Sequence, residues 1–242
     1  MRLPRAPVAD LAPGPRRLDA RTARYLARVL RLREGDRFVA FDPARAVEGD
    51  ARITSLDGDA AAVDVSALAR SRVVAARSTL WIQGLAKGDK CDAIVRDATE
   101  LGATAVVIAT TARAVVKLDP ARAAARLERW RRIAGEAARQ CGRGDAPSVD
   151  LAPWGEALAR APAGSARFCL YEAAVAPLGP PLLAALDDGR ALAFAAGPEG
   201  GLTDEEARAA EDADYACVSL GPFILRTETA AAAVLGAARV WG

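Results

Sequence analysis

Short apolar runs and longer amphipathic segments alternate along the chain from residue 79 to its end. The apolar runs end at turn residues and predict buried strands at 79–86, 105–111, 148–152, 166–172, 191–196 and 215–220. Apolar positions three or four residues apart predict helices at 90–102, 119–142, from 154, near 180–186, at 203–212 and at the C-terminal end. Asp119 is expected to cap the second of these helices. This alternation predicts an α/β domain with a parallel sheet covered on both faces.

The first 70 or so residues follow a different pattern, in which Asp-Gly and Glu-Gly turn signals separate short β-like runs. Three strands are predicted, at 37–42, 48–56 and 61–68. One helix is predicted to begin after Asp19, which is a suitable N-cap. These elements predict a small β-barrel. We therefore expect two domains, 1–72 and 73–242, with the boundary near residues 70–78.

The composition limits the chemistry that this chain can perform. Its 242 residues are 52% hydrophobic and 26% charged and include no histidine. Catalysis must therefore use carboxylates, Arg, Lys, Tyr, backbone dipoles or a cofactor. The cysteines form no CxxC pair, so that we expect no metal site and expect reduced core residues at Cys91, Cys141, Cys169 and Cys217. No apolar run is long enough for a secretory or membrane segment, which predicts a cytoplasmic protein.

The net charge of +2 is distributed unevenly. Nine Arg and two Asp lie between Met1 and Arg33, and nine basic and three acidic residues lie between Arg113 and Arg143. By contrast, the segment 197–214 has seven acidic residues and one Arg. This asymmetry is typical of a basic face that binds a polyanion, and an ordinary solvated surface is the alternative.

Three loops that follow predicted strands contain the candidate chemistry. They read CLYEAA, GPEGGLTDEE and LGPFILRTETA, and begin at Cys169, Gly197 and Leu220. Ligands of open parallel sheets bind beyond the carboxyl ends of the strands, so that these loops predict a ligand crevice. The glycines of GPEGG permit close approach to the backbone. The loop does not fit GxGxxG, and no Lys-Ser/Thr pair follows it.

Some polar residues of these loops have a structural explanation and others do not. Thr203 and Glu206 are expected to form a capping box for the helix that follows. Glu199 precedes that cap, where a helix has no use for it, and is a candidate to contact a ligand. At the start of the last helix, either Thr227 or Thr229 is expected to be the cap.

Arg226 and Glu228 are not explained by capping. A carboxylate in the first turn of a helix is mildly favourable, whereas an arginine there is not. A surface ion pair would also account for them and would contribute little to stability. The pattern therefore leaves a ligand site and a surface pair as two interpretations of this junction.

In order and spacing, these motifs resemble those of one family. GPEGGLTDEE followed by LGPFILRTETAAAAVL resembles the paired signature of the RsmE family, the small-subunit (16S) ribosomal RNA uridine-N3 methyltransferases of the SPOUT class. Further similar segments are MRLPR at 1–5, RVLRLREGD at 28–36, KGDKCDAIVRDATELGATAVV, RAVVK and RWRRIAGEAARQCGR. The family often has Arg where this chain has Phe223, and commonly has His near the start of the first helix.

The resemblance implies a PUA-like β-barrel that binds RNA, followed by a SPOUT α/β domain with a C-terminal trefoil knot. It also implies a homodimer that uses S-adenosylmethionine (SAM) to methylate a uridine N3 of small-subunit ribosomal RNA (rRNA) on the assembled subunit. By position, the implied cofactor-binding residues are Leu170, Tyr171, Gly197, Pro198, Glu199, Gly200, Gly201, Leu220, Gly221, Ile224, Leu225, Arg226, Thr229 and Ala230.

The resemblance and the absence of histidine together suggest a mechanism. Arg226 would stabilise negative charge on the uracil carbonyls, and Glu199 or Glu228 would accept the N3 proton or orient a water molecule. Contacts to rRNA phosphates, which should weaken with salt, would come from Arg2, Arg5, Arg28, Arg31, Arg122, Arg126, Arg139 and Arg143.

Two other classes of protein are alternatives. A non-catalytic PUA-like RNA-binding protein would retain the basic face but would not need intact GPEGG and LRTET loops. A nicotinamide-dependent Rossmann enzyme would show the same α/β alternation, but this chain has no strand–GxGxxG–helix unit.

Overall fold

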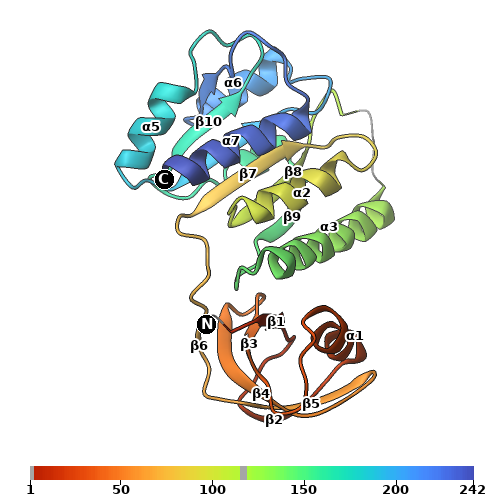
Figure 1. Cartoon of the computed structure of the whole chain (residues 1–242). Helices are drawn as coiled ribbons and strands as arrows, with labels where there is room; N and C mark the ends of the chain where they lie inside the picture. Colours follow the sequence, from red (N-terminus) through yellow and green to blue (C-terminus); the bar gives the residue numbers. More distant parts are fainter. Residues whose placement is uncertain (1–2, 115–118) are drawn as a thin grey trace. The chain divides into compact units, whose positions relative to one another are not determined.

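The computed structural model of the chain describes residues 3–114 and 119–242 and divides into two compact units (Figure 1). Unit 1 consists of the chain up to Val74 together with Ala138–Ala146. Unit 2 consists of Ala75–Ala137 and Pro147–Gly242. The short segment that ends helix α3 (Pro120–Cys141) and the loop after it therefore pack with unit 1, although they are distant from it in sequence.

Unit 1 is a mostly antiparallel sheet around a small apolar core. Its strands lie in the order β1-β3-β4-β5-β2, with β6 beside β4, and only β1 and β3 pair in parallel. Their bounds are β1 Arg5–Pro7, β2 Gly14–Leu18, β3 Arg37–Asp42, β4 Val47–Asp57, β5 Ala60–Val65 and β6 Ala69–Arg70. The three predicted strands are confirmed as β3, β4 and β5, whereas the short β1, β2 and β6 were not predicted.

The first helix of unit 1 begins where the sequence predicts. Helix α1 (Ala20–Arg24) continues into a π-helical turn, Tyr25–Val29. Asp19 is the N-cap, and its carboxylate accepts a hydrogen bond of 2.9 Å from the backbone N–H of Thr22. Leu26 and Ala23 are fully buried against the sheet core, so that the segment is held by its apolar side.

Glu48 of β4 is a buried carboxylate that connects three side chains of unit 1. It accepts hydrogen bonds from Arg5 (2.8 Å), Arg72 (2.6 Å) and Ser71 (2.9 Å), and its side chain is 4% exposed. The Arg5 guanidinium also lies 4.8 Å from the centroid of the Phe41 ring. Burial alone would raise the pKa of Glu48, but these donors outweigh burial and lower the pKa to about 2.

We expect acid to destabilise unit 1 through Glu48. Its folded pKa of about 2 lies below the ordinary value of 4.5, so that the stabilisation is complete above pH 4.5 and is lost as the pH falls toward 2. A shift of this size corresponds to about 3 kcal/mol. Amide exchange of β4, followed between pH 5 and 2 for the wild type and Glu48→Gln, measures it. Equal pH dependence of the two proteins would contradict this expectation.

Unit 2 is a six-stranded parallel sheet in the order β12-β10-β11-β7-β8-β9. Its strands are β7 Thr79–Gly84, β8 Ala105–Thr110, β9 Ser148–Pro153, β10 Ala166–Leu170, β11 Leu192–Ala196 and β12 Ala216–Val218. All six predicted strands are confirmed, with ends that differ by a few residues. The predicted architecture, a small β domain followed by an α/β domain with a parallel sheet, is confirmed.

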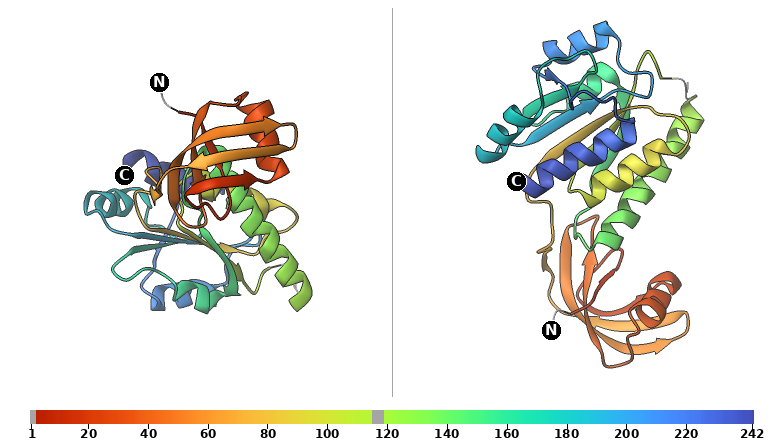
Figure 2. Two further views of the ribbon diagram at one scale, coloured as in Figure 1. Left: turned by 90° about the horizontal axis from the view of Figure 1, so that it is seen from below. Right: turned by 45° about the horizontal axis from the view of Figure 1, so that its top comes forward.

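Helices cover both faces of this sheet because alternate strand residues point to opposite sides. One face carries α3 together with α2 (Lys90–Glu100), α5 (Gly179–Asp187) and α7 (Thr227–Trp241). These helices pack around Trp81, Phe168 and Phe194 of the sheet. The other face carries α4 (Trp154–Leu158) and α6 (Asp204–Asp212). Figure 2 shows α7, α2 and α3 lying next to one another.

Two of the helix caps predicted in unit 2 are confirmed. Asp119 accepts a hydrogen bond of 3.0 Å from the Arg122 N–H at the start of α3, and Thr203 and Glu206 form the predicted capping box.

All four cysteines are free, but Cys141 is exposed. The prediction that every cysteine is a core residue is therefore wrong for Cys141, because Cys141 is the last residue of α3 and follows the last buried position of the helix, Ala138.

The strand order places the candidate loops together. The chain passes from β7 through β8 to β9 at one edge, and then returns to form β10, β11 and β12 on the other side of β7. The direction of the connections thus changes at β7. Parallel sheets bind ligands at such a point, beyond the carboxyl ends of the strands. The loops after β10, β11 and β12 lie at that point. No helix of the described residues is both long and apolar enough to cross a membrane.

Candidate active site

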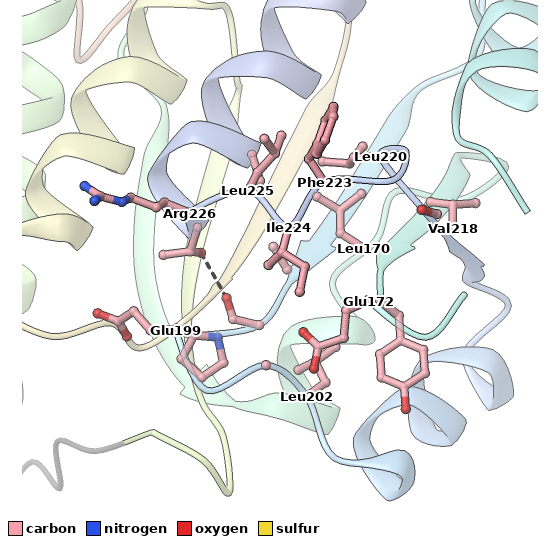
Figure 3. Close-up of a pocket in the computed structure, with 18 of the residues that line it drawn as sticks. Leu170, Glu172, Glu199, Leu202, Val218, Leu220, Phe223, Ile224, Leu225 and Arg226 are labelled. Carbon is pink, nitrogen blue, oxygen red and sulfur yellow. Dashed lines mark hydrogen bonds between the residues drawn. The ribbon is translucent and has the colours of Figure 1, made fainter. Parts of the chain in front are cut away.

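A cavity of about 390 Å³ lies at the carboxyl ends of β10, β11 and β12 (Figure 3). The three loops predicted from the sequence supply nearly all of its wall. Twelve of the fourteen predicted cofactor-binding residues line it: Leu170, Tyr171, Gly197, Pro198, Glu199, Gly201, Leu220, Gly221, Ile224, Leu225, Arg226 and Ala230. Gly200 and Thr229 belong to the same loops but are not among the lining residues.

Several further residues line the cavity that were not among the fourteen predicted cofactor-binding residues. Within the predicted loops these are Glu172, Leu202, Pro222, Phe223 and Thr227, and outside them Ser219, Ala196, Val218 and Lys90. The carboxyl ends of parallel strands lie at the same edge of a sheet, where ligands bind. Ala196 and Val218, the last residues of β11 and β12, could therefore have been predicted to line the cavity. Lys90 is the first residue of α2 and lies six residues after the end of β7. No local sequence pattern indicates that it lines a cavity.

The glycines of the second loop allow its backbone to fold tightly against its neighbours. A Cβ atom on Gly197 would lie 3.0 Å from Gly201 and Leu202. Gly201 has a φ of +70°, and a Cβ atom there would lie 2.6 Å from the Glu172 carboxylate. On β7, a Cβ atom on Gly84 would lie 2.5 Å from Pro198. The loop is thus in close contact with both β7 and the loop after β10.

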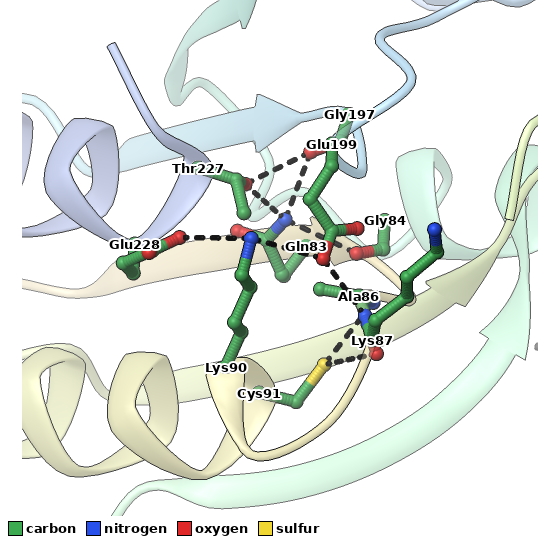
Figure 4. A network of polar contacts seen from close by, with 10 residues as sticks. All are labelled: Gln83, Gly84, Ala86, Lys87, Lys90, Cys91, Gly197, Glu199, Thr227 and Glu228. Carbon is green, nitrogen blue, oxygen red and sulfur yellow. Dashed lines mark hydrogen bonds and ion pairs between the residues drawn. The ribbon is translucent and has the colours of Figure 1, made fainter. Parts of the chain in front are cut away.

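Gln83 is a buried hub behind this cavity (Figure 4). Its side-chain Nε2 donates to Thr227 Oγ1 at 2.7 Å, to the Gly197 carbonyl at 2.9 Å and to the Gly84 carbonyl at 3.1 Å. Its Oε1 accepts a hydrogen bond of 3.2 Å from the Trp81 indole. Thr227 also donates to the Gly197 carbonyl at 3.0 Å. One amide thus connects β7, the glycine loop and the start of α7.

The last helix begins without a side-chain cap, which corrects one expectation. Arg226 occupies the N-cap position, Thr227 is already helical, and its hydroxyl bonds to Gly197 and Gln83 instead. The interpretation of Thr227 or Thr229 as the cap is therefore wrong. The start of α7 lines the cavity, so that the positive end of the helix dipole lies there. Helix N-termini in this position can bind an anion or a polarised group.

Lys90 lies between the two candidate carboxylates. Its Nζ is 3.1 Å from Glu199 Oε1 and 3.8 Å from Glu228 Oε2. Glu199 also accepts a hydrogen bond of 3.0 Å from the backbone N–H of Lys87. Partial burial raises the pKa of Glu199. The backbone N–H groups of Glu199 and Lys87, together with the Lys90 ammonium, outweigh burial and lower the pKa below its usual value. Glu199 lines the cavity, whereas Glu228 is not among the lining residues.

Arg226 lies at the rim of the cavity with an exposed side chain. Among the described residues, no group forms a hydrogen bond or ion pair with its guanidinium. It therefore does not form the surface pair with Glu228 that the sequence left open as one interpretation. A positively charged group at the rim remains available to a bound molecule.

The predicted RNA-binding arginines occupy different surroundings. Arg28, Arg31 and Arg122 are exposed, Arg126 and Arg139 are half-buried, and Arg2 lies outside the described residues. Arg5 is engaged by Glu48 and Phe41, and Arg143 is buried with an ion pair of 2.8 Å to Asp145. Across the part of the chain that the structure describes, no cluster of three or more His, Cys, Asp or Glu is arranged to hold a metal.

Known proteins share this sequence and fold. The family described as RNA methyltransferase domain matches residues 76–239, and the RNA methyltransferase PUA domain matches residues 18–66. Ribosomal RNA small subunit methyltransferase E of Bacillus subtilis is 33% identical over 212 residues, which cover 85% of this chain and 82% of that protein. The protein of the same name from Mycobacterium bovis is 38% identical over 164 residues, or 66% and 62% of the two chains.

A solved structure extends this similarity to the whole chain. Ribosomal RNA small subunit methyltransferase E from Neisseria gonorrhoeae, bound to SAM, superposes with a TM-score of 0.81 at 30% identity. The alignment covers 98% of this chain and 97% of that one. The fold and the cavity thus define an RNA methyltransferase with a PUA-like N-terminal domain. The chain belongs to the RsmE family, as its motifs predicted.

Proposed function

We propose that this chain transfers the methyl group of SAM to N3 of a uridine in small-subunit (16S) rRNA. The observation that carries the proposal is the cavity at the ends of β10, β11 and β12, with the Arg226 guanidinium at its rim, where no described residue pairs with it. The SAM-bound relative of Neisseria gonorrhoeae and the names of the relatives support it. The resemblance of the GPEGG and LRTET loops to those of the RsmE family supports the choice of uridine N3.

SAM is the cofactor, and the lining residues fit it. Leu170, Leu202 and Ile224 provide apolar surface for a purine ring, and the Glu172 carboxylate provides negative charge for a cationic molecule. A Cβ atom on Gly201 would take up the space beside Glu172, so that glycine keeps this part of the cavity open. When bound, SAM supplies a methyl group that is already activated by its positively charged sulfur.

The protein must hold the base in line and favour its deprotonated form, because protonated N3 is a poor nucleophile. Arg226 is placed to stabilise the negative charge that spreads onto the uracil carbonyls as the proton leaves. Its guanidinium has no competing partner among the described residues, so that its charge is available to the base. The N-terminal end of α7 adds to the positive potential at the same place.

Glu199 is the better placed of the two candidate carboxylates, since it lines the cavity and Glu228 does not. Its lowered pKa keeps it ionised near neutral pH, so that it can orient a water molecule that takes the proton. A carboxylate of low pKa is a weak base, which makes a direct and lasting transfer to Glu199 unfavourable. Lys90 holds the carboxylate in position at 3.1 Å.

Replacing Lys90 with Met is expected to move the acid limb of methyl transfer to higher pH. Loss of the cation removes one of the groups that lower the pKa of Glu199, so that the carboxylate becomes protonated at a higher pH than in the wild type. The pH dependence of kcat/KM measures the change, and Lys87→Met, which leaves the Lys87 backbone N–H in place, is the matched control. Superimposable acid limbs for Lys90→Met and wild type would rule out this role.

The remaining proposals concern RNA, assembly and topology. Arg28, Arg31 and Arg122 are exposed and are proposed to bind rRNA phosphates, which set affinity rather than base choice. Arg126, Arg139 and Arg2 are proposed for the same role, and Arg5 and Arg143 only if their internal partners release them. A homodimer, a C-terminal trefoil knot and a cytoplasmic location are proposed from the resemblance to the family.

Methyl transfer to purified ribosomal subunits tests the proposal. Small subunits from a host that lacks this methylation are incubated with the full-length chain and methyl-labelled SAM, and the rRNA is digested to nucleosides. Label is expected in 3-methyluridine and to decrease as ionic strength rises. Label on another base or on a ribose would overturn the choice of N3. Complete absence of label, with tight RNA binding, would instead favour a non-catalytic RNA-binding protein.

A further inference from the structure

Two cysteines that the proposed reaction does not use lie beside each other in the sheet of unit 2. Cys169 of β10 and Cys217 of β12 are paired in register on adjacent parallel strands. Both side chains contribute to the same apolar cluster and therefore point to the same face. In-register neighbours on adjacent strands lie about 4.8 Å apart, which is within the Cα separation that a disulfide spans.

The two thiols differ in access and in ease of ionisation. Cys169 is fully buried, whereas Cys217 is partly exposed and its Sγ lies 3.8 Å from the Ala207 carbonyl. The neighbouring Cys169 thiol lowers the pKa of Cys217, while the pKa of Cys169 is raised. Cys217 is therefore the thiol that an oxidant reaches and that reacts as the thiolate. Cys169 is placed to attack the product.

The pair is adjacent in sequence to the cofactor cavity. Leu170 and Val218, which follow the two cysteines directly, both line that cavity and are themselves in register. The Cβ atoms of a disulfide are about 3.8 Å apart, so that a bond would draw these strand positions together by about 1 Å. A shift of this size at Leu170 and Val218 changes the wall of the cavity.

We propose that Cys169 and Cys217 form a peroxide-sensitive dithiol, whose oxidation to a disulfide weakens binding of SAM. The Cys217 thiolate attacks hydrogen peroxide, one O–O bond breaks, and Cys217 becomes a sulfenic acid as hydroxide leaves. The Cys169 sulfur then attacks the Cys217 sulfur, the S–O bond breaks, and water is released. In total, two thiols lose two electrons and two protons, and one peroxide becomes two water molecules.

The other two cysteines provide controls within the same chain. Cys91 is buried and its pKa is raised to about 11, chiefly by burial, so that it is expected to stay reduced. Cys141 is exposed and could join two chains, so that the experiment uses the full-length Cys141→Ser protein. The matched variant carries Cys217→Ser in the same background, which removes one sulfur and keeps a side chain of similar size.

The protein is treated with hydrogen peroxide, free thiols are alkylated, and the peptides are mapped by mass spectrometry. SAM affinity is measured by calorimetry before oxidation, after oxidation and after reduction with dithiothreitol. A Cys169–Cys217 link, Cys91 alkylated, and a Kd for SAM raised about fivefold or more and restored by reduction are expected. Peroxide should leave the Kd of the Cys217→Ser variant unchanged. Absence of the link, or an unchanged Kd in the linked protein, would overturn the proposal.

Discussion

Arg226→Ala is expected to lower kcat for methyl transfer by about 100- to 1000-fold with little change in SAM affinity. The guanidinium lies at the cavity rim and pairs with none of the residues that the structure describes, so that its removal should withdraw the proposed charge stabilisation and leave the fold intact. Single-turnover transfer to small subunits gives the rate, and calorimetry gives the affinity for SAM. The effect should appear in kcat because the developing charge exists only on the way to the transition state.

Two further variants make the Arg226 test specific. Arg226→Lys keeps a positive charge but not the planar pair of donors, and is expected to recover only part of the rate. Arg208→Ala removes an exposed arginine on α6, outside the cavity lining, and is expected to behave as the wild type. An Arg226→Ala protein with full transfer activity and unaltered SAM affinity would exclude the proposed role.

Gln83→Leu is expected to lower the free energy of unfolding by about 2–3 kcal/mol and to weaken SAM binding at least tenfold. Leucine has a similar volume but leaves the Trp81 indole and the Gly197 carbonyl without their Gln83 partner inside the protein. The loop that Gly197 begins then loses its attachment to β7. Denaturant unfolding and calorimetric titration with SAM measure the two effects separately.

A double-mutant cycle of Gln83 and Thr227 distinguishes the effect of their shared hydrogen bonds on SAM affinity from the effect of a general loss of stability. Thr227→Val removes the hydroxyl that accepts from Gln83 and donates to Gly197, and Thr227→Ser keeps it. The effects of Gln83→Leu and Thr227→Val on SAM affinity should be strongly non-additive because the two side chains share one network. Additive losses, or equal losses for Thr227→Ser and Thr227→Val, would mean that the network does not position the cavity.

The local elements could be predicted because the relevant signals lie within a few residues of one another. Apolar runs marked the strands of the parallel sheet, and Asp19, Asp119 and Thr203 marked three helix starts. The short strands β1 and β2 were missed because prolines and arginines interrupt their pattern, and pairing with β3 and β5 forms them. Such strands exist through tertiary contacts rather than through their own preferences.

The site could be predicted only in part, for the same physical reason. Strand ends and glycines located the three loops, so that most of the cavity wall followed from the sequence. The hydrogen bond between Gln83 and Thr227 joins residues 144 positions apart, and no local pattern indicates it. Lys90 likewise approaches Glu199 only in the folded sheet. Thr227 looked like a cap, but the folded chain uses its hydroxyl for the hub.

Amide hydrogen exchange with and without SAM tests the central claim most directly, namely that the loops after β10, β11 and β12 together bind the cofactor. Saturating SAM should slow exchange in residues 170–172, 197–203 and 219–227 of the full-length protein, and should leave β3 to β5 of unit 1 unchanged. Because bound ligand stabilises what it contacts, protection should depend on SAM concentration. SAM binding that protects other segments and leaves all three loops unaffected would contradict the account.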